Sequence, residues 1–361
     1  MSLFQPCFVS MNNIAWVLLG LVGVGVVVGS WALMRMPSGL SGDAAGISTT
    51  DVTSDVAEAG RQLYHLELNG EEREFLVYRP EDLVGTDEVP VVFVYHGSGG
   101  NGPKFFDTTG WKVKADEEGL MVVFPTAMKY HIFDDEKVVR GVVRQDVRSF
   151  QTKWNSYELP GLLDADYPDQ VLADDVQFTK EIISFLDDKY AIETDKMYVT
   201  GFSNGAQMTT RLMVEMSDVF AAFAPVGGGI TPDQVLEKIV DEDADPTPRP
   251  IIQMIGEVDP KLTHHVGVTV FSLDESSMDP GNAVYDTYVE NILSIQELAD
   301  AGTYEYRNQA AIYTYDQSTG AQDNIYQLII VKGMQHIYPN GINAPFDVAD
   351  YFWPFFERYS L

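Results

Sequence analysis

The stretch from residue 197 to residue 229, MYVTGFSNGAQMTTRLMVEMSDVFAAFAPVGGG, constrains the fold of this chain most. It begins with a short apolar strand, turns sharply through Gly201-Phe202-Ser203-Asn204-Gly205, and continues as a helix to about Met216. A second buried strand follows at about residues 220–226. A serine on such a strand-to-helix turn is pushed out over the end of a sheet. The stretch therefore predicts an α/β domain with Ser203 as a candidate nucleophile.

Two glycines flank Ser203, and so tight a turn requires them. A side chain at Gly201 or Gly205 would collide with the strand or with the helix. The helix that follows adds free N–H groups beside the position where a tetrahedral oxyanion would form. The pattern G-x-S-x-G can also arise by accident in a chain with 30 glycines. Its interpretation therefore depends on partner residues elsewhere in the chain.

The rest of the chain alternates apolar strands with helices. Asn69-Gly70 joins two runs of alternating character and predicts a hairpin at the start of the domain. Such an alternation predicts an α/β fold with a mainly parallel central sheet. The expected elements are strands at 61–68, 72–78, 91–95, 120–124, 251–255 and 326–331, helices at 111–118 and 179–188, and an aromatic-rich helix at 347–358 interrupted near Pro354.

A glycine-rich loop, His96-Gly97-Ser98-Gly99-Gly100-Asn101-Gly102, follows the predicted strand at 91–95. Such a loop can aim backbone N–H groups into the crevice above a sheet. We assign the N–H of Ser98 and the N–H of Asn204 as a candidate oxyanion hole. A phosphate-binding loop is the competing interpretation, but the pattern G-x-x-x-x-G-K-[S/T] is absent. His96 is expected to be structural.

A nucleophilic serine needs a base, and the base needs a carboxylate that fixes its tautomer. Asp259 follows the predicted strand at 251–255 and is the candidate carboxylate, with Glu257 as a weaker substitute. His336 follows the last predicted strand and is the candidate general base. The alternative is that His336 is a structural histidine of the core. The neighbouring His264 and His265 are expected on an exposed loop.

The segment 129–175 is expected to be irregular. Long loops above a rigid sheet commonly line substrate sites. Trp154 is therefore a candidate wall of the substrate site, and packing of Trp154 on the core is the alternative.

Composition excludes some classes of ligand. The formal net charge is −31 and the sequence pI is near 4.3, so the folded domain would repel nucleic acid and anionic lipid. A solvated acidic surface suited to a saline medium is the plain interpretation. The single cysteine, Cys7, allows no intrachain disulfide.

The N-terminal part of the chain contains a 21-residue uncharged and mostly apolar run at 14–34, IAWVLLGLVGVGVVVGSWALM. This run is long enough to cross a bilayer as a helix. The first basic residue is Arg35, after the run, which favours an uncleaved anchor over a cleaved signal. We predict an extension at 1–13, an anchor at 14–34, a flexible linker at 35–60 and a catalytic domain at 61–361. The domain is expected outside the cytoplasm, either membrane-anchored or secreted.

The sequence resembles the polyhydroxybutyrate depolymerase-like, feruloyl and acetylxylan esterases of the α/β-hydrolase superfamily. The resemblance covers about residues 61–361 and rests on the loop at His96-Gly97, the pair Trp154-Asn155, and the stretches YVTGFSNGAQM and GMQHIYPNG. Tyr338 stands where the family has a tryptophan, and Ala206 stands where it has a glycine. The resemblance implies an α/β-hydrolase fold and substrate contacts near Gly99, Trp154 and Tyr338.

The expected activity is that of a serine carboxylester hydrolase, with Ser203, His336 and Asp259 as its catalytic triad. Acyl, feruloyl or hydroxyalkanoate esters are the expected substrates, and no metal or organic cofactor and no protein partner are expected. Two alternatives stay open. The same triad serves peptidases, and an inactive hydrolase scaffold can serve as a membrane-tethered binding protein.

Overall fold

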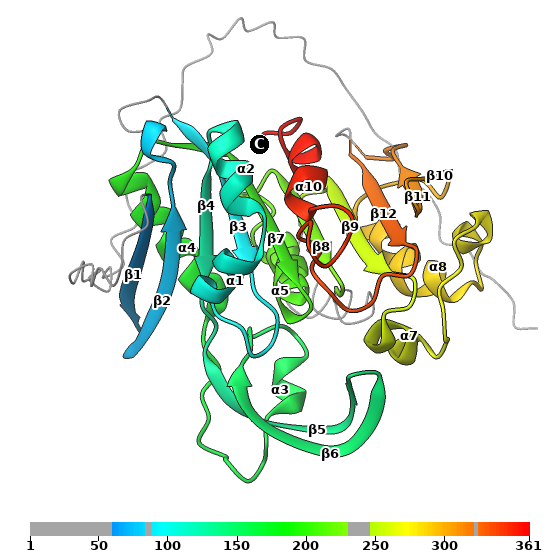
Figure 1. Ribbon diagram of the computed structural model, residues 1–361, viewed down its shortest axis with the longest axis horizontal. Helices are drawn as coiled ribbons and strands as arrows, with labels where there is room; N and C mark the ends of the chain where they lie inside the picture. The colour runs from blue at the N-terminus through cyan, green and yellow to red at the C-terminus, as the bar shows by residue number, and fades with distance from the viewer. Residues whose placement is uncertain (1–59, 84–87, 230–245, 321–323) are drawn as a thin grey trace, which may run out of the picture. The chain divides into compact units, whose positions relative to one another are not determined.

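A ten-stranded sheet forms the centre of the domain (Figure 1). The computed structural model describes residues 60–83, 88–229, 246–320 and 324–361. The strand order is β1-β2-β4-β3-β7-β8-β9-β12-β11-β10, with parallel pairing from β4 through β12 and antiparallel pairing at both edges. The strands are β1 (Arg61–Leu68), β2 (Glu71–Tyr78), β3 (Val89–Tyr95), β4 (Met121–Pro125), β7 (Ile192–Phe202), β8 (Ala222–Val226), β9 (Ile251–Gly256), β10 (Thr303–Arg307), β11 (Ala310–Tyr315) and β12 (Tyr326–Val331).

Successive residues of the central strands pack into two separate cores, one on each face of the sheet. In β3, Val91 and Phe93 belong to one core, whereas Val92 and Val94 belong to the other. This alternation follows from the period of two in a strand, and burial on both faces explains why these strands read as continuous apolar runs. The domain is therefore a sheet between two helical layers.

The helices divide between the two cores. Residues of α4, α5, α8 and α9 pack in the first core, and residues of α1, α2 and α10 pack in the second. The helices are α1 (Gly102–Thr108), α2 (Trp111–Glu118), α3 (Leu159–Leu162), α4 (Asp175–Lys189), α5 (Asn204–Glu215), α7 (Pro260–Val266), α8 (Ala283–Tyr288), α9 (Glu290–Ile295) and α10 (Val348–Phe356), with 3-10 turns η1 (Glu81–Leu83) and η2 (Glu275–Met278).

The predicted strands of the central sheet and the predicted helices are found within a few residues of their expected bounds. The hairpin at Asn69-Gly70 is also confirmed, because β1 and β2 pair antiparallel across that turn. The prediction that α10 is interrupted near Pro354 is wrong, since the helix continues to Phe356. Its aromatic side chains are buried against the second core, and this packing outweighs the backbone hydrogen bond that proline cannot donate.

The prediction of an irregular segment at 129–175 is wrong for most of its length. Strands β5 (Lys129–Val139) and β6 (Val142–Thr152) form a separate antiparallel hairpin, drawn in green at the bottom of Figure 1. Arg140 and Gly141 close it with φ angles of 50° and 74°, as a two-residue hairpin turn requires. Many residues of β6 are exposed, so the buried apolar run that marks the central strands is missing here.

The predicted segments at 1–13, 14–34 and all but the last residue of the linker at 35–60 lie outside the described residues. Within the residues that are described, no helix has the length and apolar character needed to span a bilayer.

Candidate active site

Ser203 lies between β7 and α5 with a backbone conformation that few residues other than glycine adopt. Its φ angle is 55° and its ψ angle is −116°. Strain of this kind costs about 1–3 kcal/mol and persists only where the surrounding structure imposes it. Here the Ser203 N–H donates to the Val226 carbonyl at 2.9 Å, and the Ser203 carbonyl accepts from the Gln207 N–H at 3.1 Å. The turn therefore holds the Ser203 side chain above the end of the sheet.

The glycines beside Ser203 are required by close backbone contacts. A Cβ at Gly201 would lie 2.3 Å from the Gly205 carbonyl oxygen, and a Cβ at Gly205 would lie 2.1 Å from the Tyr95 carbonyl oxygen. Helix α5 thus approaches β3 at a distance that only glycine allows.

We expect Gly205→Ala to lower the free energy of unfolding by about 2 kcal/mol or more, because the added methyl group would have to displace the backbone. Urea unfolding followed by circular dichroism measures the change. Gly161→Ala is the control, since a Cβ there meets nothing within 4 Å, and it should alter stability by less than about 0.5 kcal/mol. Equal effects of the two substitutions would contradict the packing argument.

Three side chains from distant parts of the chain form a continuous hydrogen-bonded row. His336 Nε2 lies 2.9 Å from Ser203 Oγ, and His336 Nδ1 lies 2.7 Å from Asp259 Oδ2. Asp259 is fully buried and His336 is mostly buried. Each residue follows a parallel strand, β7, β9 or β12, and the carboxyl ends of these strands lie at one edge of the sheet. The arrangement is that of a serine, a base and an orienting carboxylate.

Asp259 is fixed by its second oxygen. Its Oδ1 accepts from the N–H groups of Lys261 at 2.9 Å and Leu262 at 3.2 Å, so Asp259 also caps α7. The weaker candidate Glu257 instead accepts from the Gly333 N–H at 2.7 Å.

The prediction that His264 lies on a loop is wrong, because the residue belongs to the short helix α7. Asp259 caps this helix, Pro260 is its first residue, and Gly267 follows its end.

The neighbouring His265 belongs to the same helix, α7, so its predicted loop position is also wrong. Both histidines are exposed, as expected.

His96 holds the glycine-rich loop after β3. Its Nε2 accepts from the Ala127 N–H at 3.1 Å, so its Nδ1 carries the proton that is donated to the Gly97 carbonyl at 2.8 Å. Burial lowers the pKa of His96 to about 4, although the hydrogen bond to Gly97 acts in the opposite direction. His96 is thus a neutral structural residue.

The lowered pKa of His96 predicts acid sensitivity. The pKa of His96 is 6.5 in the unfolded chain and about 4 in the folded chain. Between these pH values the unfolded chain binds the proton more strongly, so stability is lost as the pH falls through that window. At pH 5 the loss due to His96 should be roughly 2 kcal/mol. In His96→Asn, urea unfolding should show a correspondingly smaller difference in stability between pH 7 and pH 5. An unchanged difference would exclude His96 as its source.

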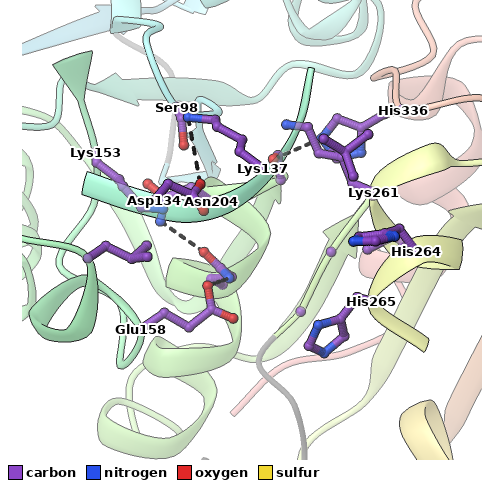
Figure 2. Close-up of a pocket in the computed structure, with 18 of the residues that line it drawn as sticks. Ser98, Asp134, Lys137, Lys153, Glu158, Asn204, Lys261, His264, His265 and His336 are labelled. Carbon is purple, nitrogen blue, oxygen red and sulfur yellow. Dashed lines mark hydrogen bonds and ion pairs between the residues drawn. The ribbon is translucent and has the colours of Figure 1, made fainter. Parts of the chain in front are cut away.

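Ser98 and Asn204 border the cavity that contains Ser203 and His336 (Figure 2). Asn204 is the first residue of α5, so its N–H has no carbonyl one turn earlier in the helix to accept it. Gly97 passes close to the turn at Ser203, because a Cβ on Gly97 would lie 3.5 Å from Ser203 Cβ. Both residues assigned to the oxyanion hole are therefore placed beside the candidate nucleophile.

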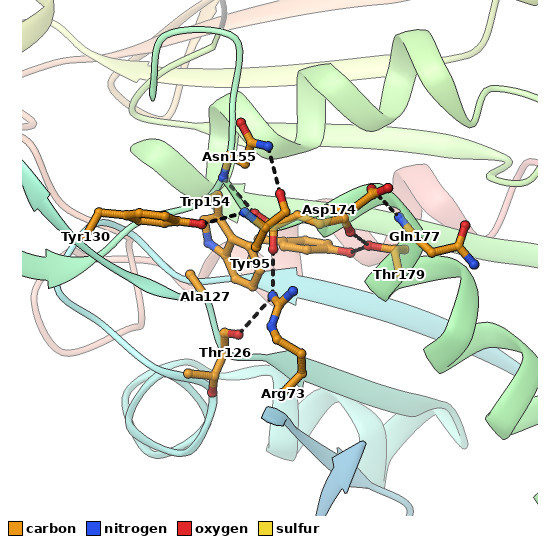
Figure 3. Close-up of polar contacts among 12 residues, drawn as sticks. Arg73, Tyr95, Thr126, Ala127, Tyr130, Trp154, Asn155, Asp174, Gln177 and Thr179 are labelled. Carbon is orange, nitrogen blue, oxygen red and sulfur yellow. Dashed lines mark hydrogen bonds and ion pairs between the residues drawn. The ribbon is translucent and has the colours of Figure 1, made fainter. Parts of the chain in front are cut away.

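The prediction that Trp154 forms a wall of the substrate site is wrong. Its side chain is fully buried, and its Nε1 donates to the His96 carbonyl at 2.8 Å. Beside it, Asp175 accepts from the Arg73 guanidinium at 2.6 Å and from the Asn155 N–H at 2.7 Å (Figure 3). This network fixes Trp154 behind the glycine-rich loop, so the alternative of core packing holds.

The other two predicted substrate contacts also differ from expectation. Tyr338 is buried, and its hydroxyl accepts from Trp111 Nε1 at 2.8 Å, so it does not border the cavity. Gly99 is exposed in the loop, but its N–H donates to the Thr152 carbonyl at 2.8 Å and is not free for a substrate.

The cavity beside Ser203 has a volume of about 630 Å³ and is rich in polar and charged groups. This is within the range of about 300–1,000 Å³ that is common for small-molecule sites. Much of its wall comes from residues that the sequence did not single out as site residues, although some of them belong to the segment 129–175, which was expected to line a substrate site. These are Ile132, Asp134, Glu136, Lys137, Val138, Gln151, Lys153, Glu158 and Leu162 of the β5–β6 hairpin and the segment after it, Gly227, Gly228 and Gly229 after β8, Lys261, Leu262, His264 and His265 of α7, and Thr287 and Tyr288 of α8.

Comparisons with known proteins agree on an esterase relationship. No family model matches the chain. An acetyl xylan esterase from Aspergillus awamori has a similar structure, with a TM-score of 0.51 and 14% identity over 82% of this chain and 98% of that chain.

Two curated relatives match in sequence. The bifunctional acetylxylan esterase/xylanase XynS20E of Neocallimastix patriciarum is 26% identical over 159 residues, 44% of this chain and 18% of that protein. NocK of Nocardia uniformis subsp. tsuyamanensis, which carries the provisional name of an esterase, is 27% identical over 172 residues, 47% of this chain and 40% of that protein. The matches thus span less than half of either relative. The chain therefore has the α/β-hydrolase fold, and part of it is similar in sequence to two proteins named as esterases.

Proposed function

We propose that this protein is a serine carboxylester hydrolase that works through an acyl-enzyme. The observation that carries the proposal is the row Asp259–His336–Ser203, with distances of 2.7 Å and 2.9 Å, at the strained turn before α5. Ser203 Oγ attacks the ester carbonyl while His336 Nε2 accepts its proton. His336 then donates that proton to the departing alcohol. Water attacks the acyl-enzyme in the second half of the reaction, again with His336 as base.

The negative charge that develops on the carbonyl oxygen is stabilised by the backbone N–H groups of Ser98 and Asn204. Asp259 keeps the proton of neutral His336 on Nδ1 and stabilises the imidazolium that forms. These groups account for the whole reaction cycle with residues that border one cavity or lie directly behind it.

Acetylated sugars are the favoured substrates, because one sequence relative is named as an acetylxylan esterase/xylanase. The test is a panel of acetylated xylo-oligosaccharides, methyl ferulate, 3-hydroxybutyrate oligomers and an aminoacyl 4-nitroanilide. At least one ester should be hydrolysed with a kcat/KM about 100-fold or more above that of the amide, since the alcohol is the better leaving group. Faster turnover of the amide would favour a peptidase. Absence of turnover together with absence of fluorophosphonate labelling would favour an inactive binding scaffold.

A further inference from the structure

Three lysines border the cavity that contains Ser203 and His336: Lys137 from β5, Lys153 after β6, and Lys261 from the first turn of α7 (Figure 2). The whole chain has 54 acidic residues against 23 lysines and arginines, so a group of three lysines beside the candidate nucleophile is unexpected from composition. They come from two separate walls of the cavity, the hairpin and α7.

The carboxylates of the same cavity are already engaged by other donors. Glu136 accepts from Gln145 Nε2 at 2.9 Å and lies 2.7 Å from His264 Nε2, while Glu158 accepts from Gln207 Nε2. Asp134 lies 4.0 Å from Lys137 Nζ. Among the described residues, Lys137 is thus the cavity lysine that lies within ion-pair distance of a cavity carboxylate.

Lys153 and Lys261 are the other two lysines that border the cavity. Across the ranges of the chain that are described, neither ammonium group makes a hydrogen bond or an ion pair with a protein group. Burial is the main cause that lowers the pKa of the half-buried Lys153, although the charges of Glu158 and Asp134 act in the opposite direction. Lys261 is exposed to the solvent of the cavity. A bound anion would give both ammonium groups the direct counter-ion that they lack among the described residues.

We propose, building on the proposed esterase function, that Lys153 and Lys261 bind an anionic group of the substrate, so that the preferred ester carries a carboxylate or a sulfate. An acidic protein repels such a substrate at long range, so recognition has to come from a local cationic site. An ammonium group binds a carboxylate as a point charge through up to three donors, and this attraction stabilises the bound substrate. A neutral ester would gain none of this free energy.

Matched pairs of esters test the proposal and distinguish the two sides of the ester bond. Mono-4-nitrophenyl succinate and 4-nitrophenyl butyrate differ in charge on the acyl side. Sodium 4-acetoxybenzoate and 4-acetoxybenzamide differ in charge on the alcohol side. In at least one pair the kcat/KM of the anionic ester should exceed that of the neutral ester about tenfold or more, and added salt should reduce the ratio.

The Lys153→Gln/Lys261→Gln double variant should bring this ratio to within about threefold of one, mainly by raising KM for the anionic ester. Lys332→Gln is the control, because it removes the same charge from an exposed residue that does not border the cavity. It should leave the ratio unchanged. A ratio near one in the unmodified protein for both pairs, or an equal change in both variants, would overturn the proposal.

The anion site can also be tested if the protein does not hydrolyse esters. If no ester is turned over, titration calorimetry with succinate and with sulfate on the unmodified protein still tests the lysine pair. Binding that is weakened about tenfold or more in the double variant but not in Lys332→Gln would support the anion site alone. Absence of binding in the unmodified protein would overturn it.

Discussion

Ser203→Ala should lower kcat for 4-nitrophenyl acetate by about 10⁴- to 10⁶-fold, because the atom that forms the acyl-enzyme is removed. The residual rate would come from the oxyanion hole and from substrate binding. Initial rates at saturating ester measure the effect, and circular dichroism confirms that the fold is retained. The substitution removes one hydroxyl and its contact with His336 Nε2, and leaves the contacts of the turn, which are made by backbone groups, in place.

Ser294→Ala is the matched control for this experiment. Ser294 is an exposed residue of α9 and does not border the cavity, so its substitution should leave kcat within about twofold. Retention of more than about a tenth of the activity by Ser203→Ala would show that another group is the nucleophile.

The second large effect is expected for Asp259→Asn, with a loss of about 10⁴-fold in kcat at neutral pH. The backbone N–H groups of Lys261 and Leu262 hold one oxygen of Asp259, and an amide oxygen would take this position. The amide NH₂ would then point at His336 Nδ1 and force that nitrogen to accept. The proton of the neutral imidazole would move to Nε2, where it prevents His336 from accepting the proton of Ser203.

The nearby carboxylate Glu257 supplies the control. Its side chain accepts from the Gly333 N–H, so Glu257→Gln should keep kcat within about tenfold of the unmodified value. A larger loss with Glu257→Gln than with Asp259→Asn would reverse the assignment of the carboxylate. The kinetics of both variants against 4-nitrophenyl acetate decide between them.

The candidate triad and the central sheet could be predicted because they depend on local patterns. Ser203, Asp259 and His336 each follow a strand that is buried on both faces, and such strands are readable as apolar runs. Parallel pairing then brings their carboxyl ends to one edge of the sheet. The order of a serine, a carboxylate and a histidine along the chain then indicated which residue has which role.

The walls of the cavity could not be predicted in the same way. The β5–β6 hairpin forms a two-stranded sheet of its own, and its exposed residues vary without a clear apolar period. Trp154 was expected at the substrate because long loops commonly line sites, and Tyr338 because of the family resemblance. Both are held in the interior by hydrogen bonds to distant residues, the His96 carbonyl and Trp111. Lys153 follows β6 and Lys261 lies in α7, so only the folded chain shows that they border the same cavity.

Mapping of the covalent adduct with a fluorophosphonate tests the account most directly, because this reagent reacts with an activated serine and not with an ordinary one. Tandem mass spectrometry of the digested, labelled protein should place the phosphonyl group on Ser203. Labelling should be lost in Ser203→Ala and strongly slowed in Asp259→Asn. An adduct on another residue, or equal labelling of Ser203→Ala, would contradict the proposal that Ser203, His336 and Asp259 form a catalytic triad.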